Sequence, residues 1–439
     1  MIKFLLAIPA FIKVGGVFTG MLVSYRLRMP LGVAIFLWAV VLTAWSGAGT
    51  AGFAYQLQSF SLAQNYLLPV VILLLLMFSE ALNASGRMKQ TIEALNSRIS
   101  DKRMMLGGLP ALVGLVPMPG GALFSAPMVG SVDEGKSLDP AFKAAVNYWF
   151  RHLWEYWWPL YPGVILAIRY SSVPAGYYYL FQLPFTVIAG IGGWFFLLRK
   201  LKMKSGGTRP DSAPFTGRTS VLPALVPIAI LLAVSMAGST ALTRAGISGN
   251  LSSMLSMLAG LLLALVMVCR SDRIIIKKTL GTIRKKNTLL MIILVIGIQV
   301  FSASLKCPLS GDITDTLVHQ MQNDFLHRGV PLLLVFALVP FVSGMVTGVA
   351  FGFVGASFPI VLGLLGGAPP FHVLMAATSF AFGCGYIGML LSPVHVCFVV
   401  TNEYFRANMF STYRHIIPPA LVQIAFCCVV SGAYYLLLR

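Results

Sequence analysis

The chain has 439 residues, of which 57% are hydrophobic and only 10% are charged, and its mean hydropathy is +0.83. These values exclude a water-soluble globular domain, because apolar stretches of about 20 residues, long enough to cross roughly 30 Å of hydrocarbon, recur along the whole length. The net charge of +19 does not indicate a nucleic-acid partner, because lysine and arginine concentrate in loops between the apolar spans. The predicted partner is a lipid bilayer.

The first half of the chain is predicted to contain five membrane spans and one broken segment. The N-terminal segment resembles a signal peptide, but Lys13 interrupts its apolar run and no small-residue cleavage site follows, so we predict a retained first helix. The predicted spans are residues 3–24, 31–49, 65–85, 147–169 and 176–198, and the broken segment is 105–131. A polar linker over residues 199–219 carries six lysines and arginines and is predicted to be cytoplasmic.

The second half repeats this organisation. Its predicted spans are residues 220–240, 249–269, 288–305, 371–399 and 414–438, and its broken segment is 330–367. The two broken segments share a Ser-x-Pro phrase, at Ser125 and Ser357, in otherwise apolar sequence rich in glycine.

Each broken segment is predicted to be a re-entrant hairpin. The arms of the first have about 12 residues, roughly 18 Å of helix, which is about half the hydrocarbon core. The alternative is a kinked helix that crosses the membrane, but a single crossing would invert everything beyond it. With both hairpins returning to their own side, the predicted inside loops collect 23 lysines and arginines. This assignment gives ten full crossings and places both termini outside.

The topology makes the second half an inverted copy of the first, because an odd number of crossings reverses orientation. The hairpin serines lie 232 residues apart, and Pro162 and Pro393, in the helices after the hairpins, lie 231 apart. The predicted fold is an all-α polytopic membrane protein made of two inverted repeats, each with five transmembrane helices plus one re-entrant hairpin.

Broken backbone at membrane depth is tolerated where it is buried in protein or lines a cavity, and a duplicated pair of breaks points to a transporter's binding site. Exposed helix N-termini suit an anion, while freed carbonyls and hydroxyls suit sodium. The alternative is close packing of small residues between helices. The predicted substrate-binding residues in these breaks are Gly120, Gly121, Ser125, Gly355, Ser357 and Ser392. The predicted sites for a coupling sodium ion or proton are Ser125, Thr347, Gly348, Ser357, Gly383 and Gly385.

The helices after the hairpins are also predicted to be discontinuous. In the second half, Gly383, Gly385 and Pro393 favour an unwound middle. His395 follows that proline and, as a lone histidine, is predicted to be a packed residue.

The matching helix in the first half carries charge. Arg151 and Glu155 are four residues apart, so they would share one helix face. Ionisable groups inside a span are costly and are functional candidates. Three interpretations stay open: Arg151 binds an anionic substrate, Glu155 carries a coupled proton, or the two neutralise each other in a packed bundle.

Motifs for catalysis and metal binding are missing from the sequence. It contains no HExxH, no GxSxG and no plausible catalytic aspartate pair within its spans, so no enzyme is predicted. Six cysteines without a CxxC motif indicate neither a disulfide framework nor a zinc site. No cofactor is predicted, and no metal beyond a sodium ion, with sodium or a proton as the coupling ion.

The phrase from Pro117 to Pro127 and the phrase from Gly355 to Pro359 resemble a membrane family, the domain-of-unknown-function family numbered 401. This family is grouped with the ion transporter superfamily, beside gluconate permeases, citrate and dicarboxylate–sodium symporters and arsenite permeases. The resemblance implies hairpin tips that meet broken helices at mid-membrane, an elevator mechanism, a homodimer and the cytoplasmic membrane of a prokaryote. The sodium-coupled dicarboxylate relatives carry Ser-Asn-Thr at both tips, and this chain carries it at neither.

The resemblance also implies a division of the chain into a scaffold and a moving transport domain. The scaffold would be residues 1–104 and 220–329, and the transport domain residues 105–198 and 330–439. The predicted function is a secondary active transporter for a small organic anion such as a carboxylate, coupled to sodium or protons. The alternatives are a cation/proton antiporter that uses Glu155, an intramembrane enzyme and a channel.

Overall fold

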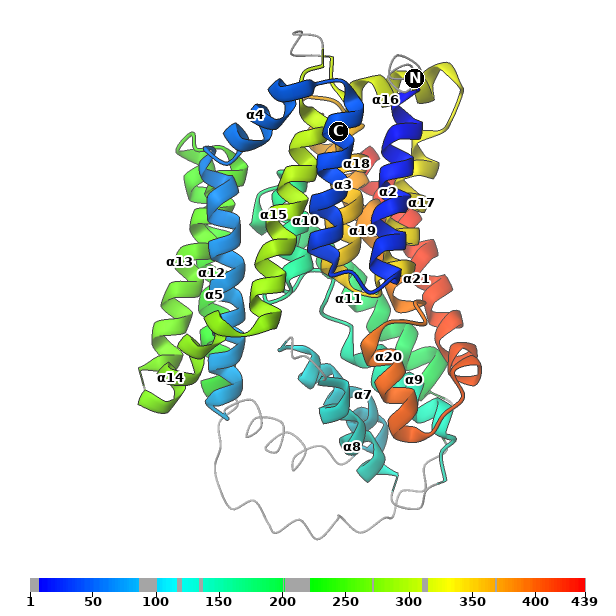
Figure 1. Cartoon of the computed structure of the whole chain (residues 1–439). Coiled ribbons are helices and arrows are strands. Elements are labelled where there is room, and N and C mark those ends of the chain that lie inside the picture. The colour runs from blue at the N-terminus through cyan, green and yellow to red at the C-terminus, as the bar shows by residue number, and fades with distance from the viewer. Residues whose placement is uncertain are drawn as a thin grey trace.

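The computed structural model describes residues 8–86, 101–116, 121–133, 137–199, 201, 222–270, 272–309, 315–367 and 369–438 (Figure 1). These residues form helices joined by short connections, and the β-structure among them is a single isolated bridge between Pro308 and Thr316. The predicted all-α class is therefore confirmed.

The helices of the first half follow the predicted order. They are α2 (Ala10–Arg26), α3 (Leu31–Ser46), α4 (Gly49–Ser59), α5 (Ala63–Ala84), α7 (Lys102–Gly114), α8 (Gly121–Val132), α9 (Pro140–Arg151), α10 (Pro162–Ser171) and α11 (Ala175–Gly193), which runs on as a π-helical turn to Leu198.

The helices of the second half begin after the linker. They are α12 (Leu222–Arg244), α13 (Gly249–Cys269), α14 (Arg273–Gly281), α15 (Lys286–Lys306), α16 (Leu317–His327), α17 (Leu332–Thr347), α18 (Ala350–Gly363), α19 (Phe371–Leu390), α20 (Val396–Phe405) and α21 (Met409–Leu437).

Seven of the described helices are long and apolar enough to cross a membrane, namely α5, α11 with its π-helical turn, α12, α13, α15, α19 and α21. Of the remaining predicted spans, α2 and α3 have 17 and 16 residues. The predicted span 147–169 is divided between α9 and α10. The chain is thus a polytopic helical membrane protein.

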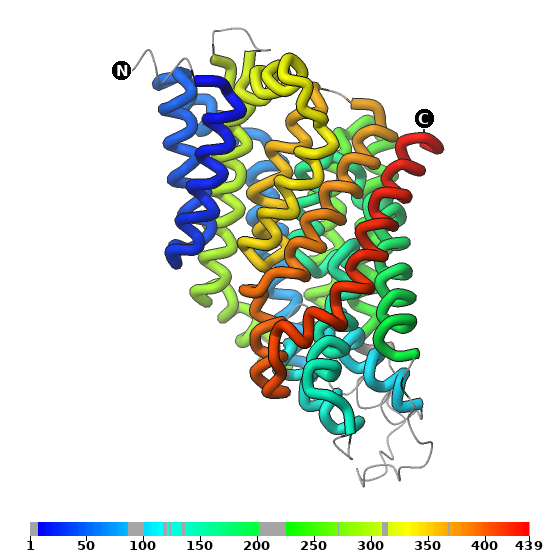
Figure 2. The backbone as a smooth tube through the Cα atoms, turned by 90° about the vertical axis from the view of Figure 1, so that its right-hand side faces the viewer, coloured from blue at the N-terminus to red at the C-terminus, as the bar shows by residue number. Residues whose placement is uncertain are grey.

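The arms of the two predicted hairpins are present and enter from opposite ends of the molecule; most of the predicted turn of the first, residues 117–120, lies outside the described residues. In Figure 1, α7 and α8 lie at the lower end, while α17 starts near α16 at the upper end and turns back into α18. The described ends of the chain also lie toward the upper end (Figures 1 and 2). The second hairpin turns at Gly348, whose φ of +62° lies in the left-handed region that glycine adopts without strain. This opposed arrangement is that of two inverted repeats.

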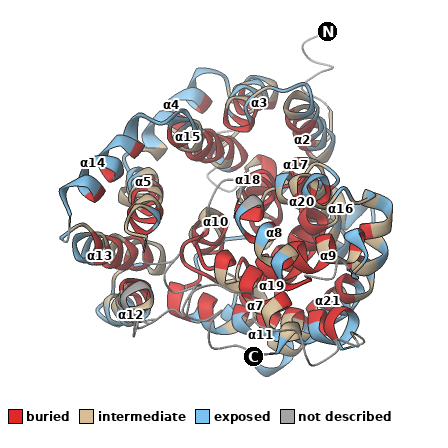
Figure 3. Ribbon diagram, turned by 90° about the horizontal axis from the view of Figure 1, so that it is seen from below, coloured by how far each residue is buried: buried red, intermediate tan, exposed pale blue. Residues whose placement is uncertain are grey.

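Viewed from below, the helices separate into a curved row and a thicker body (Figure 3). The row contains α2 to α5 and α12 to α15, held by the contacts of α12 with α13, α13 with α5 and α15 with α3. The body surrounds α19, and 83% of the apolar stretch of this helix is buried inside the protein. Helix α19 packs on α17 and α21. The predicted division into a scaffold and a moving domain concerns motion and stays a prediction.

Close packing in the body depends on glycines of α17 and α19. A Cβ on Gly344 would lie 2.2 Å from the Gly385 carbonyl oxygen, and one on Gly388 would lie 2.1 Å from the Phe341 carbonyl oxygen. Small residues therefore let the two backbones approach, as is common between membrane helices.

The prediction that α19 unwinds at its glycines is wrong. The helix runs without interruption through Gly383 and Gly385 and ends at Leu390. Gly383 packs against the Cys427 thiol of α21, and Gly385 against the Phe353 ring of α18. These glycines serve close approach, so the predicted ion-coupling role loses its structural basis at both positions.

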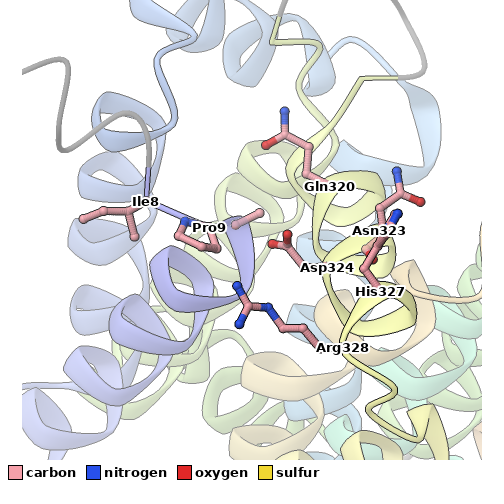
Figure 4. Close-up of a pocket in the computed structure, with 8 residues that line it drawn as sticks. Ile8, Pro9, Gln320, Asn323, Asp324, His327 and Arg328 are labelled. Atoms are coloured by element: carbon pink, nitrogen blue, oxygen red, sulfur yellow. The ribbon is translucent and has the colours of Figure 1, made fainter.

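A hollow of about 540 Å³ lies at the periphery, where α2 begins beside α16 (Figure 4). The Phe11 N–H donates to Asp324 Oδ2 at 3.4 Å, and the Arg328 guanidinium lies 4.8 Å from the centre of the Phe11 ring. This contact holds the amphipathic α16 against α2 and is remote from the hairpin tips.

Candidate functional site

Two broken helices meet in the body of the molecule. The first is interrupted between Arg151, the last residue of α9, and Pro162, the first residue of α10. A proline suits that first position, because the N–H that it lacks would have no partner within the helix. The second is interrupted between Leu390 and Val396, around Pro393. The predicted discontinuity of both helices is confirmed.

The predicted helix face shared by Arg151 and Glu155 is absent, because the helix ends at Arg151 and Glu155 lies in the break. The two charged groups contact different partners. Glu155 Oε1 lies 3.8 Å from His152 Nε2, while Arg151 Nη1 donates to Cys397 Sγ at 3.4 Å. The exposed fractions of Arg151, His152 and Glu155 are 3%, 1% and 6%, so all three are buried ionisable groups.

The return arm of the first hairpin starts against Arg151. Gly121 is the first residue of α8, and a Cβ there would lie 2.2 Å from Arg151 Nη2, so only glycine allows this approach. Asn147 Nδ2 donates to the Ala122 carbonyl at 3.4 Å and to Thr401 Oγ1 at 3.1 Å. These bonds join the first turn of α8 to α9 and α20.

The tip of the second hairpin lies against the second break. A Cβ on Gly348 would lie 3.0 Å from the backbone of His395. Ser392 Oγ donates to the Met345 carbonyl at 2.7 Å and so satisfies one of the last carbonyls of α17. The Tyr25 hydroxyl donates to the Thr347 carbonyl at 3.1 Å, which ties α2 to the same tip.

A cavity of about 660 Å³ lies between the curved row and the body. The body lines it with the first break and with the first turns of three helices: Pro162 and Gly163 of α10, Ala350 and Phe351 of α18, and Val396 and Cys397 of α20. The row lines it with residues of α3, α5 and α15. The first N–H groups of a helix lack intrahelical partners and carry a partial positive charge. Three such ends therefore face one space.

Charged groups lie at two levels of this cavity. Arg151 and Glu155 line it beside the hairpin tips. Glu80 of α5 and Lys285, directly before α15, also line it and form an ion pair with Nζ and Oε2 2.8 Å apart. Lys285 is half exposed, so this pair lies where the cavity approaches the surface.

The comparisons with known proteins are consistent with this architecture. The sequence matches the family described as "Protein of unknown function (DUF401)" over residues 16–434. The chain belongs to this family. No curated protein matches the sequence.

The fold of this chain is similar to that of a solved transporter. The crystal structure of the Alcanivorax borkumensis YdaH transporter, described as having an unusual topology, aligns with a TM-score of 0.57 at 15% identity, over 87% of each chain. At this identity the likeness shows the fold alone. This family member is thus a polytopic membrane protein with a fold that a transporter shares.

The predicted site residues occupy different positions relative to the cavity. Arg151, Glu155 and Gly348 line it. Ser357 donates to the Phe353 carbonyl at 2.6 Å inside α18, and Gly355 packs against the Ile298 side chain. The other described site residues do not line the cavity, because they are buried between helices or at helix ends. They are Gly121, Ser125, Thr347, Ser392, Gly383 and Gly385. Gly120 lies outside the described residues.

Two cavity residues escaped the prediction. His395 is buried as predicted, yet its Nε2 lies 3.0 Å from His152 Nε2 rather than among apolar groups. Cys397, the second residue of α20, lies beside Arg151. The sequence signal that could have indicated His395 and Cys397 is their position just after Pro393. In an inverted repeat, side chains beside the break of one helix lie close to the break of the other helix.

Proposed function

We propose that the protein is a secondary active transporter that moves a small organic anion, such as a carboxylate, across the cytoplasmic membrane of a prokaryote. The observation that carries the proposal is the convergence of three helix N-termini and Arg151 on one cavity of about 660 Å³. Cavities of roughly 300–1,000 Å³ hold small organic ligands.

The chemistry of the cavity suits a carboxylate. Backbone N–H groups at the starts of α10, α18 and α20 supply donors aligned with helix dipoles. The guanidinium of Arg151 adds a fixed charge that matches a carboxylate in a bidentate manner. Its packing against Gly121 holds it at the tip of the first hairpin.

The position of the cavity supports an elevator-type mechanism. It lies between helices of the curved row and helices of the body, so sliding of the body along the row would carry the cavity lining with it. Homodimerisation through the row and an outside location of both termini are part of the same proposal.

A second candidate, a cation/proton antiporter, rests on Glu155. Its carboxylate is buried, lines the cavity and lies 3.8 Å from His152 Nε2, so a proton could pass between the two groups. In the anion transporter the same pair would carry the coupled proton, with sodium as the alternative coupling ion.

The test of anion binding is a thermal-shift screen of purified protein against organic anions, with sodium or choline, at two pH values. A bound anion should raise the Tm of the wild type and leave that of Arg151→Gln unchanged. Arg244→Gln, which removes an exposed arginine at the end of α12, is the matched control and should respond as the wild type does. An anion response that survives in Arg151→Gln would reject the assignment.

The test of coupling is uptake into proteoliposomes. Glu155→Gln should remove the pH dependence of anion uptake if Glu155 carries the proton. Proton release driven by a cation gradient, without any organic anion and dependent on Glu155, would favour the antiporter instead.

A further inference from the structure

Two imidazoles and a thiol form a compact cluster at the meeting point of the two broken helices. One ring nitrogen of His152, one ring nitrogen of His395 and Cys397 Sγ all lie within 4.8 Å of one another, and all three residues line the cavity. We propose that this cluster binds a divalent transition-metal ion of the zinc class. No metal-binding motif in the sequence indicates this cluster, because its ligands come from the two halves of the chain.

The donor types match such an ion. Zinc and its neighbours in the first row prefer imidazole nitrogen and thiolate sulfur in tetrahedral sites, with Zn–N of about 2.0–2.1 Å and Zn–S of about 2.3 Å. Two nitrogens on one tetrahedral ion are about 3.3 Å apart on those bond lengths. The two Nε2 atoms are 3.0 Å apart, close to that separation. Cys397 needs to move inward by about an ångström to complete the set.

The orientation of His152 is already that of a metal ligand. Its Nδ1–H donates to the Tyr148 carbonyl at 2.6 Å, which leaves the Nε2 lone pair directed at the cluster. A ligating histidine usually gives its second ring N–H to a carbonyl or carboxylate in this way.

The charges around the cluster suit a thiolate and a dication. Arg151 Nη1 lies 3.4 Å from Cys397 Sγ and would stabilise the thiolate form that binds metal. Glu155 Oε1 lies 3.8 Å from His152 Nε2, so a carboxylate is available as a fourth ligand, and a metal bound in this way would replace the proton that the pair carries in the metal-free protein. A thiolate and a carboxylate together neutralise a dication, which lowers the cost of holding it in a buried place.

The competing arrangement is a direct hydrogen bond between the two imidazoles, with His395 Nε2–H donating to His152 Nε2. It requires no metal, and His395 Nδ1 is buried without a hydrogen-bond partner in either arrangement. The two arrangements differ in what they bind, so spectroscopy separates them.

The experiment is a titration of chelator-treated, purified full-length protein with Co²⁺, whose spectrum reports geometry and sulfur ligation. We expect one equivalent to give tetrahedral d–d bands and a thiolate-to-cobalt charge-transfer band, which zinc then displaces. The charge-transfer band should vanish in Cys397→Ser, and cobalt affinity should fall at least tenfold in His395→Gln. The matched controls, Cys384→Ser and His372→Gln, remove a cysteine and a histidine of α19 outside the cluster and should keep the wild-type spectrum.

A measurement on the wild type covers the case in which a variant fails to fold. Zinc should slow alkylation of Cys397 by a maleimide at least tenfold, read by peptide mass spectrometry, while the exposed Cys428 reacts at an unchanged rate. No tetrahedral cobalt spectrum, or a charge-transfer band that survives in Cys397→Ser, would overturn the proposal. Neither readout requires a transported anion, so failure here leaves the proposed transport function standing.

Discussion

The hydroxyl of Tyr148, on α9, donates at 3.0 Å to the carbonyl of Leu390, which is the last residue of α19. A reciprocal bond runs the other way, from the Tyr386 hydroxyl of α19 to the His152 carbonyl at the end of α9. Each broken helix thus supplies a tyrosine that satisfies a carbonyl released by the break in the other. This exchange stabilises two interruptions that would otherwise leave polar backbone buried.

Removing either hydroxyl should destabilise the fold. In Tyr148→Phe the ring keeps its packing, but the buried Leu390 carbonyl loses its donor, at a cost of about 1–3 kcal/mol. In Tyr386→Phe the His152 carbonyl keeps only the Glu155 N–H, at 3.4 Å, so the cost lies toward the lower end of that range. We expect the Tm of each variant to fall by several degrees in thermal unfolding. Tyr66→Phe, which changes an exposed tyrosine of α5, should leave the Tm unchanged. Equal Tm values for all three variants would contradict the bracing role.

The space around Gly121 should control anion affinity. In Gly121→Ala the added methyl would lie 2.2 Å from Arg151 Nη2, so the guanidinium must move away from the hairpin tip. On the proposed function, we expect the anion Kd to rise about tenfold, or about 1.4 kcal/mol, as measured by ligand-dependent thermal shift. Gly108→Ala, in the other arm of the same hairpin, meets no atom within 4 Å and serves as the control. Equal affinities in the two variants would argue against Arg151 as the anion partner.

The packing of α17 on α19 should not tolerate a methyl group at Gly388. An added Cβ would lie 2.1 Å from the Phe341 carbonyl oxygen, and backbone cannot move aside as a side chain can. Overpacking of this kind costs about 1–3 kcal/mol, so the Tm of Gly388→Ala should fall by several degrees. Gly190→Ala, in α11, has open space around it and should unfold at or slightly above the wild-type temperature. A wild-type Tm for Gly388→Ala would show that the two helices can separate without cost.

Asp133, which follows α8 outside the membrane spans, should make stability fall in acid. Burial raises the pKa of Asp133, but hydrogen bonds from Lys143 Nζ, from the Leu138 and Ser137 N–H groups and from the Ser137 hydroxyl outweigh burial and hold the pKa below its usual 3.8. Because the folded pKa is the lower one, this stabilisation is present above about pH 3.8 and is lost as the pH falls through the folded pKa.

The variant Asp133→Asn tests this dependence. At neutral pH it should lose about 1–3 kcal/mol, because a buried acceptor of several hydrogen bonds is replaced, and its Tm should change less than that of the wild type between neutral pH and pH values below the usual pKa. Asp139→Asn removes a carboxylate of which 61% is exposed, and should keep the wild-type pH profile. Identical acid profiles for the wild type and Asp133→Asn would contradict the role of Asp133.

Composition and charge distribution were enough to predict the class, the order of the elements and the re-entrant hairpins. These features depend on properties read along the chain: the length of apolar runs, the side on which lysine and arginine accumulate, and the breaks at glycine and proline. The bilayer imposes them locally, because each span must satisfy its backbone within itself. The hairpins around Gly121 and Gly348 follow from such local signals.

The glycines of an apolar span and the spacing of two charged residues could not be interpreted from the sequence without knowing which residues pack against them. A glycine in an apolar span is typical both of an unwound segment and of close packing, and only the contact with Phe353 shows that Gly385 serves packing. The spacing of Arg151 and Glu155 indicated one helix face. In the structure α9 ends at Arg151 and α10 begins only at Pro162, so Glu155 lies in the unwound segment between the two helices.

The inverted repeat and its broken helices were therefore determined by the sequence itself, through the length of the apolar runs, the breaks at glycine and proline, and the distribution of charge. The chemistry at the breaks was decided by the tertiary structure. His152 and His395 lie in different halves of the chain, and they meet because two inverted hairpins bring both breaks to one point. Contact between residues so far apart depends on how helices pack, and packing is a property of surfaces that no local pattern records.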